Sequence, residues 1–145
     1  MLIEHILRRK GSDVVTVSAQ DPVTSAVAVL GEHNIGALVV AGDDGAIVGI
    51  LSERDVVRAL ARDGATVLQQ AVGDLMTTEV TTCGLLMTAN DLMSVMTERR
   101  IRHIPVVSSE DQLVGIVSIG DVVKSRIDEL ETERETLHDY LSGRS

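Results

Sequence analysis

Apolar and polar positions follow one another in short blocks, and the blocks occur in the same order in both halves of the chain. The first half predicts, in chain order, a strand, a helix, the two strands of a hairpin and a closing helix, at residues 14–17, 21–35, 37–41, 46–51 and from Ser52 onward. The hairpin turn, Gly42-Asp43-Asp44-Gly45, consists of residues that tolerate positive φ. The second half predicts the same elements at residues 80–83, 90–100, 104–107, 112–117 and from Ser118 onward.

An internal duplication explains this order. A shift of 66 positions aligns residues 15–60 with residues 81–126 without a gap, and twelve positions are then identical. One repeat of about 60 residues would be only marginally stable by itself. We therefore expect two repeats, each a small β-sheet flanked by helices, to bury their sheet faces against each other about a pseudo-twofold axis. The fold class is α/β, in the α+β sense of helices packed on small sheets.

The duplication also predicts how the chain is divided. We expect residues 1–70 to form the first repeat with an N-terminal lead-in helix at Ile3–Leu7, and residues 71–127 to form the second repeat with its lead-in helix at residues 71–77. Residues 128–145 would be an acidic, helical C-terminal extension. The closing helices are expected to turn paired valines inward, namely Val56, Val57, Val122 and Val123. An apolar stripe continues along the last helix through Val123, Ile127, Leu130, Leu137 and Leu141, and Arg134 interrupts it.

The amino-acid composition argues against several classes of function. The 145 residues carry a formal net charge of -9, and Tyr140 is the only aromatic residue. Nucleic acids and anionic membranes are therefore poor partners, because their binding requires basic surfaces and commonly uses aromatic stacking. No apolar run approaches the roughly 20 residues that span a bilayer, so we expect a cytoplasmic protein. Cys83 is the single cysteine, and with no catalytic motif or metal-ligand spacing the chain is not expected to be an enzyme or to bind a metal.

Two copies of a Ser-x-x-Asp motif are the first candidates for chemistry. Ser52 with Asp55, and Ser118 with Asp121, stand where a strand is expected to end and a helix to begin. One interpretation is a variant capping box, in which serine and acid satisfy backbone N–H groups of the first turn. The other is a nucleotide site, because a helix N-terminus attracts phosphate and a carboxylate accepts hydrogen bonds from both ribose hydroxyls. The two interpretations are compatible.

Three segments carry a family resemblance: Asp-Leu-Met-Thr at residues 74–77, Ile-Arg-His-Ile-Pro-Val-Val at residues 101–107, and Gly-Ile-Val-Ser-x-x-Asp-Val-Val at residues 115–123. This pattern resembles the cystathionine-β-synthase (CBS) domain, and the chain is similar to a stand-alone CBS pair, often called a Bateman module. The resemblance implies a regulatory, non-catalytic module that binds an adenosine-containing molecule between its repeats and forms homodimers of CBS pairs. It favours AMP, with ADP, ATP, NAD(H) or S-adenosylmethionine as alternatives. An unidentified protein would be the partner that receives the signal.

The expected binding residues lie at matching positions of the two repeats: Thr16, Ala37, Ser52, Arg54, Asp55, Thr82, Arg102, His103, Ile104, Pro105, Ser118 and Asp121. In at least one cleft, Ser118 and Asp121 would lie on one side of the ligand, and Arg54, Arg102 and His103 around its phosphates, since arginine suits forked phosphate contacts.

Ala37-Leu38 and Ile104-Pro105 would line the slot for the base, with Pro105 at a sheet edge or at a free ladder position. Each assignment has a structural alternative: solvated side chains for the arginines, a structural histidine for His103, and ordinary strand formers for Thr16 and Thr82. The alternative function is a homo-oligomeric interaction scaffold without ligand binding, assembled through the C-terminal helix.

Overall fold

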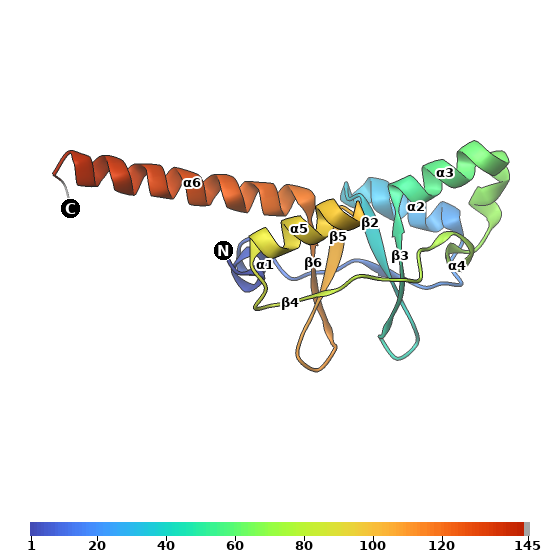
Figure 1. Cartoon of the computed structure of the whole chain (residues 1–145). Helices are drawn as coiled ribbons and strands as arrows, with labels where there is room; N and C mark the ends of the chain where they lie inside the picture. The colour runs from blue at the N-terminus through green and yellow to red at the C-terminus, as the bar shows by residue number, and fades with distance from the viewer. Residues whose placement is uncertain (144–145) are drawn as a thin grey trace.

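The computed structural model describes residues 1–143, so residues 144–145 of the predicted extension lie outside the described part. The first repeat contains β1 (Thr16–Val17), α2 (Val23–His33), β2 (Ala37–Ala41), β3 (Ile47–Ser52) and α3 (Glu53–Asp63). The second contains β4 (Cys83–Gly84), α5 (Ala89–Arg99), β5 (His103–Val107), β6 (Leu113–Ser118) and α6 (Ile119–Leu141). Outside the repeats are α1 (Ile3–Lys10), the 3-10 helix η1 (Gly64–Gln69) and α4 (Val72–Leu75). The two hairpins lie side by side in Figure 1.

The two sheets have the same topology, which confirms the predicted fold class. Each has three strands in chain order, the first pair parallel and the second pair antiparallel. Their registers are also equivalent, because Val40 faces Gly49 and Val106 faces Gly115. Pro105 is buried in the central strand β5, so the edge-strand interpretation is wrong. It lacks a ladder partner in β4 because that strand pairs only with residues 106–107.

The closing helices start as the capping interpretation predicts. At α3, the Asp55 backbone N–H donates to Ser52 Oγ (3.2 Å), and the Ser52 N–H donates to Asp55 Oδ2 (2.9 Å). Ser118 and Asp121 make the same pair of bonds at α6, at 3.2 and 2.8 Å. Each motif therefore fixes the position of a helix N-terminus before any ligand is considered.

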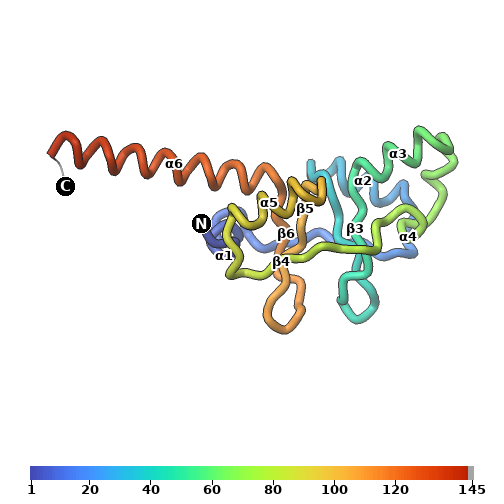
Figure 2. Tube along the Cα trace, in the orientation of Figure 1, coloured from blue at the N-terminus to red at the C-terminus, as the bar shows by residue number. Residues whose placement is uncertain are grey.

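The lead-in helices are exchanged between the repeats. The prediction assigned Ile3–Leu7 to the first repeat, but Ile3, Ile6 and Leu7 of α1 are buried in the core of the second repeat, among Leu92, Ile104 and Val117. Conversely, Val72 of α4 is buried in the core of the first repeat. Figure 2 shows the blue α1 beside β6 and α5, on the far side of the molecule from β2 and β3. Each core is therefore completed by a helix that precedes the other repeat in sequence.

The paired valines of the closing helices do not both point inward. Val56 and Val122 are buried, as predicted, whereas Val57 and Val123 are 62% and 44% exposed. Adjacent helical residues point about 100° apart, so one packed face cannot bury both. Beyond the core α6 projects as a single straight helix, and all its side chains from Glu131 onward are exposed. The predicted boundary at residue 128 thus falls within a continuous helix.

Within residues 1–143, no helix is both long and apolar enough to cross a membrane. The cytoplasmic location stays a prediction. Cys83 is buried, as expected of a small apolar core residue, and burial raises the pKa of its thiol to about 11. The thiol is therefore protonated at neutral pH and unreactive as a nucleophile.

We predict that Gly49→Ala lowers the free energy of unfolding. A Cβ at Gly49 would lie 2.5 Å from Met76 Sδ and 3.0 Å from the Thr77 carbonyl oxygen. Overpacking of this kind costs about 1–3 kcal/mol. Urea denaturation measures the change.

Gly31→Ala is the matched control, because Gly31 lies in α2 and a Cβ there meets nothing within 4 Å. This second substitution should raise stability by up to about 1 kcal/mol, as helix propensity dictates. Equal effects of the two substitutions would contradict the packing assigned to Gly49.

Candidate functional site

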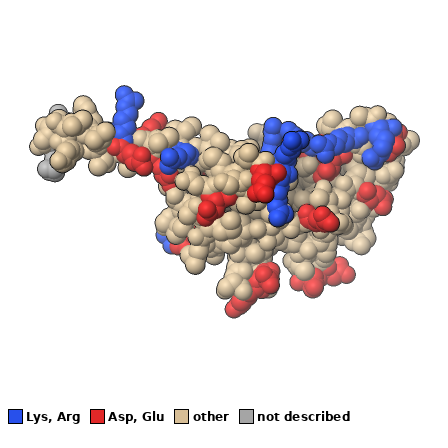
Figure 3. All heavy atoms as spheres, viewed as in Figure 1, with Lys and Arg blue, Asp and Glu red and all other residues tan. Residues whose placement is uncertain are grey.

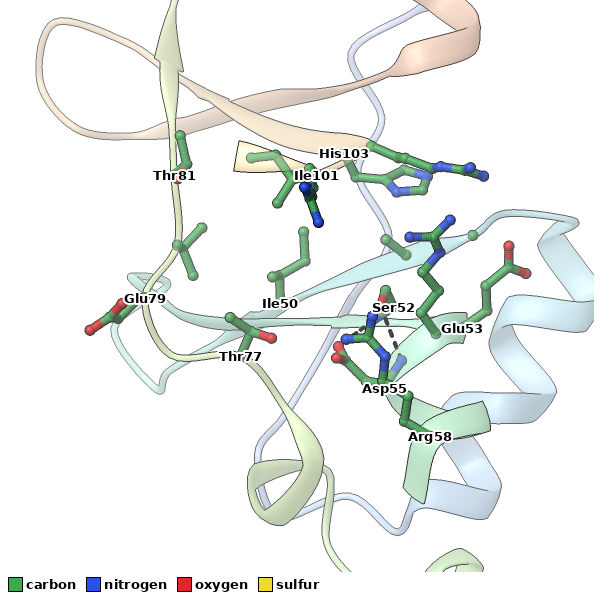
Figure 4. A pocket seen from close by; sticks show the side chains of 16 residues that line it. Ile50, Ser52, Glu53, Asp55, Arg58, Thr77, Glu79, Thr81, Ile101 and His103 are labelled. Carbon is green, nitrogen blue, oxygen red and sulfur yellow. Dashed lines mark hydrogen bonds between the residues drawn. The ribbon is translucent and has the colours of Figure 1, made fainter. Parts of the chain in front are cut away.

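A cavity of about 190 Å³ lies where the two repeats meet (Figure 4). We call it the central cavity. The first repeat lines it with Gly36, Ala37, Ile50, Ser52, Glu53, Arg54, Asp55 and Arg58. The linker between the repeats and the start of β5 complete the lining with Thr77, Glu79, Val80, Thr81, Arg100, Ile101, Arg102 and His103. The cavity is therefore built from residues of both repeats.

Backbone hydrogen bonds fix the two walls of the central cavity. Thr77 exchanges two backbone bonds with Ile50, at 2.9 and 3.0 Å, and these hold the start of the linker along β3. The Glu53 N–H donates to the Gly36 carbonyl (2.9 Å), and the Ile119 N–H donates to the Arg102 carbonyl (2.8 Å). These bonds tie the start of each closing helix to the segment just before the central strand of its own sheet.

Four arginines are concentrated at the central cavity. Arg54 and Arg58 come from successive turns of α3, and Arg100 and Arg102 precede β5. Among residues 1–143, no carboxylate oxygen lies within 4.0 Å of these guanidinium groups. Figure 3 shows Lys and Arg atoms gathered between the repeats and along α3, on a molecule of net charge -9. Unpaired guanidinium groups at a shared cavity favour an anionic ligand.

Arg100 is positioned by the end of α5. Arg100 ends α5 with φ 54°, in the left-handed region, and the equivalent residue after α2 is Asn34 with φ 52°. Asparagine tolerates this conformation well, whereas arginine adopts it at a conformational cost. Both residues end a helix in the same way, because the Ile101 N–H donates to the Met96 carbonyl and the Ile35 N–H donates to the Leu30 carbonyl, each at 3.1 Å.

At the α3 N-terminus, Asp55 supplies a carboxylate in addition to the four arginines. Asp55 uses Oδ2 to accept the capping hydrogen bond, and within residues 1–143 its Oδ1 atom accepts no hydrogen bond. In Figure 4 Ser52 and Asp55 lie on the same wall as Arg58, with Ile50 and Ile101 deeper between the repeats. A free carboxylate oxygen beside an apolar wall can accept hydrogen bonds from neighbouring hydroxyl groups of a ligand.

His103 packs across the boundary between the repeats. A Cβ at Gly36 would lie 3.0 Å from His103 Cε1 and 3.1 Å from Nε2, so the imidazole occupies the space that glycine leaves. Burial lowers the pKa of His103 below 6.5, although the nearby Glu53 carboxylate acts in the opposite direction. The ring is therefore neutral at pH 7, which suits hydrogen bonding better than charge pairing.

The predicted site residues divide into two groups. The central cavity brings together six of them: Ala37, Ser52, Arg54, Asp55, Arg102 and His103. The other six lie outside its lining: Thr16, Thr82, Ile104, Pro105, Ser118 and Asp121. Thr16 and Thr82 are exposed, and Ile104 and Pro105 are buried within the second sheet. The lining also includes residues that the sequence prediction missed, chiefly Arg58, Arg100 and Thr81; the spacing of Arg58 one turn after Arg54 could have revealed it.

Ser118 and Asp121 lie outside the lining of the central cavity, in which the arginines and His103 meet Ser52 and Asp55. The expected ligand contacts of Ser118 and Asp121 stay a prediction. Lys10 instead donates to Asp121 Oδ2 at 2.6 Å. Burial would raise the pKa of Asp121, but hydrogen bonds from Lys10 and Ser118 hold it below its usual value. The linker runs along β3, where Thr77 pairs with Ile50, and the second repeat's basic residues lie at the first motif.

Comparisons with known proteins agree with this architecture. The CBS domain family model matches residues 3–62 and 72–128. "CBS domain-containing protein CBSX3, mitochondrial" from Arabidopsis thaliana is 36% identical over 97% of this chain and 72% of its own length. A CBS-domain containing protein from Agrobacterium tumefaciens has a solved structure with TM-score 0.84 and 46% identity, covering 86% of this chain and 92% of that chain.

A further structure contains ligands. The CBS domain pair of protein MJ0100, in complex with 5-methylthioadenosine and S-adenosyl-L-methionine, is 25% identical with TM-score 0.79 and covers 89% of this chain and 98% of that one. The family-model match spans most of the chain, in two tandem segments. The chain belongs to the CBS domain family and is a tandem pair of CBS repeats.

We predict that the His103 imidazole titrates below pH 6.5 and that Glu53→Gln lowers its pKa further. Removing the Glu53 carboxylate removes the charge that favours protonation. Two-dimensional NMR of the imidazole carbons and nitrogens over pH 4–8 measures both values. Because the folded pKa lies below the unfolded value, the folded state loses stability as pH falls from about 6.5 through the folded pKa. A higher pKa in Glu53→Gln would contradict the proximity of the two groups.

Proposed function

We propose that the protein is a regulatory module that binds a phosphorylated adenosine ligand in the central cavity, with AMP as the first candidate and ADP, ATP or NAD(H) as alternatives. The observation that carries this proposal is the convergence of four arginines, which have no ion-pair partners among residues 1–143, on the capped N-terminus of α3. The ligand is an effector and not a substrate, and no catalytic step is proposed.

The central cavity offers suitable residues to the phosphate, the ribose and the base of such a ligand. Arg54, Arg58, Arg100 and Arg102 offer forked donors to phosphate oxygens, and the α3 N-terminus adds a favourable partial charge. The free Oδ1 atom of Asp55 suits the ribose hydroxyl groups. Ile50, Val80 and Ile101 provide apolar surface for a base, in a chain whose single aromatic residue, Tyr140, lies far along α6.

The complex of the MJ0100 CBS pair supports an adenosine-containing ligand of this general kind. Its two ligands, 5-methylthioadenosine and S-adenosyl-L-methionine, share the adenosine group and carry no phosphate. The adenosine part of our proposal therefore has support from a relative. The phosphate part rests on the arginines of this chain.

A ligand in the central cavity would contact both repeats at once. It would join α3 of the first repeat to residues 100–103 of the second, and so couple binding to the relative position of the repeats. A signal requires that the ligand bind two conformations with different affinity. We propose that this difference is transmitted to a homodimer and, through it, to a protein partner.

We predict that Asp55→Asn and Arg54→Ala each weaken nucleotide binding by about 10- to 100-fold, as expected for loss of a charge-assisted hydrogen bond. Asparagine keeps an oxygen that can cap α3, so folding should be preserved. Isothermal titration with AMP, ADP, ATP, NAD, NADH and S-adenosylmethionine measures the affinities.

Arg62→Ala is the matched control, because Arg62 lies on the same helix, is mostly exposed, pairs with Asp63 and is outside the cavity. It should bind like the wild type. If none of the ligands binds the wild type at millimolar concentration, the proposal is wrong.

A second candidate function, a homo-oligomeric scaffold, is favoured by the surface of α6. Its apolar stripe is exposed in the single chain, with Ile127, Leu130 and Leu137 about half exposed and Leu141 more so. Arg134 lies at the middle of residues 127–141, so two copies of the helix packed antiparallel would align their stripes about it. We propose that a second copy of the chain covers this face.

We predict that Leu130→Asp with Leu137→Asp converts a dimer to a monomer, because carboxylates would be buried in the apolar contact. Size-exclusion chromatography with light scattering measures the mass. Glu131→Gln with Glu135→Gln serves as a control on the same exposed helix. Unchanged mass in the aspartate variant would show that α6 is not the dimer contact. Nucleotide binding retained in a monomer would separate assembly from ligand recognition.

A further inference from the structure

The second Ser-x-x-Asp motif has the backbone of the first but different neighbours. Ser118 and Asp121 cap α6 with the same two hydrogen bonds that Ser52 and Asp55 make at α3. Under the 66-residue shift, the counterparts of the four cavity arginines 54, 58, 100 and 102 are Gly120, Lys124, Asn34 and Gly36. Lys124 is the one cation among these four counterparts, so three of the four arginines have no cationic equivalent at the second motif.

A different cation occupies the second motif. The Lys10 ammonium group donates to Asp121 Oδ2 at 2.6 Å and to the Ile116 carbonyl oxygen at 2.9 Å. Ile116 is the counterpart of Ile50, whose backbone is bonded to Thr77 of the linker. The Lys10 side chain thus contacts β6, the strand of the second repeat that corresponds to β3.

The two lead-in segments match with a shift of 69 residues, because Met76 packs on Gly49 as Leu7 packs on Gly115. The residue that corresponds to Lys10 is then Glu79, which is acidic and lines the central cavity, so the first motif has no counterpart of the Lys10 ammonium group. Asp55 forms no ion pair within residues 1–143. The two lead-in segments therefore differ: Lys10 pairs with the carboxylate of Asp121, and within the described residues the first motif has no such cation.

The position of Lys10 is held by the fold. Lys10 is the last residue of α1, and Ile3, Ile6 and Leu7 of that helix are buried in the second core. The ammonium group is tethered beside Asp121, and a tethered group competes at an effective concentration far above that of a free ligand. Lys10 and Asp121 are only 33% and 23% exposed, so solvent screens their attraction less than at an open surface. Other charged or titratable groups near Asp121 are His103 of β5, Lys124 of α6, and Arg9 with Asp128, which pair with each other at 2.9 Å.

We propose that Lys10 acts as an internal substitute for ligand at the second motif, so that the protein binds one nucleotide per chain, in the central cavity. This inference rests on the proposed function. A ribose would have to displace the ammonium group from Asp121, and the missing arginines leave few contacts to compensate. The duplicated sequence motif thus yields two unequal sites.

The test compares Lys10→Met, which replaces the ammonium group by an uncharged side chain of similar length, with Arg8→Met, which removes an exposed charge from the same helix. Isothermal titration with AMP, or with whichever nucleotide binds the wild type best, should give one site for the wild type and for Arg8→Met. Lys10→Met should show a second, weaker event. Asp121→Asn should leave the wild-type affinity within about twofold, whereas Asp55→Asn should weaken it by about tenfold or more.

The pKa of Asp121 in the ligand-free protein provides a second, independent test. Carbon-detected NMR of the aspartate carboxyl groups should show the pKa of Asp121 rising in Lys10→Met and unchanged in Arg8→Met, because the hydrogen bond from Lys10 lowers it. In the double variant Lys10→Met with Asp55→Asn, the central-cavity event should weaken by about tenfold or more, while the second event keeps the affinity it has in Lys10→Met.

Distinct results separate the two proposals. Two nucleotides bound per wild-type chain, or equal losses in Asp121→Asn and Asp55→Asn, would overturn the role of Lys10 and leave nucleotide binding intact. A single event in Lys10→Met would also overturn it, since the missing arginines would then be sufficient to exclude ligand. An unshifted Asp121 pKa in Lys10→Met would overturn the contact itself. Binding by none of the variants would overturn the proposed function.

Discussion

Exchange of the lead-in helices is the constraint on which the rest of the structure depends. Each small sheet needs a helix to cover part of its apolar face, and the helix that does so comes from the segment preceding the other repeat. Ile3 and Leu7 complete the second core, and Val72 completes the first. Neither repeat can bury its core fully without chain that belongs, in sequence, to its neighbour. We infer that the two repeats fold as one cooperative unit.

The exchange also creates the central cavity. To bring α4 to the first core and β4 to the second sheet, the linker must run past β3, and Thr77 pairs with Ile50 on the way. This path places the second repeat's basic residues opposite the capped start of α3. The central cavity therefore lies between the repeats because the linker that carries α4 to the first core also forms part of the cavity lining.

The same geometry explains why the repeats differ chemically. Within residues 1–143 Asp55 of the first motif has no ion-pair partner, whereas Lys10 of α1 binds Asp121 of the second. A pseudo-twofold backbone can thus carry two different sites, because the pairing of strands fixes the position of a side chain but not its charge. The identical capping boxes persist in both repeats since each helix needs its N-terminus satisfied whether or not a ligand binds.

The sequence by itself determined the elements, the duplication and the helix starts, because hydrophobic period and capping chemistry are local. It also identified Ser52, Asp55, Arg54, Arg102 and His103 as residues of interest. Only the tertiary structure decided which residues share a cavity, since Arg58 and Arg100 meet there through contacts between distant segments. It likewise decided that α1 covers the second repeat and that Lys10 reaches Asp121, across 111 positions of the chain. Local patterns specify a helix and its buried face, but the packing of the whole chain selects the surface on which that face is buried.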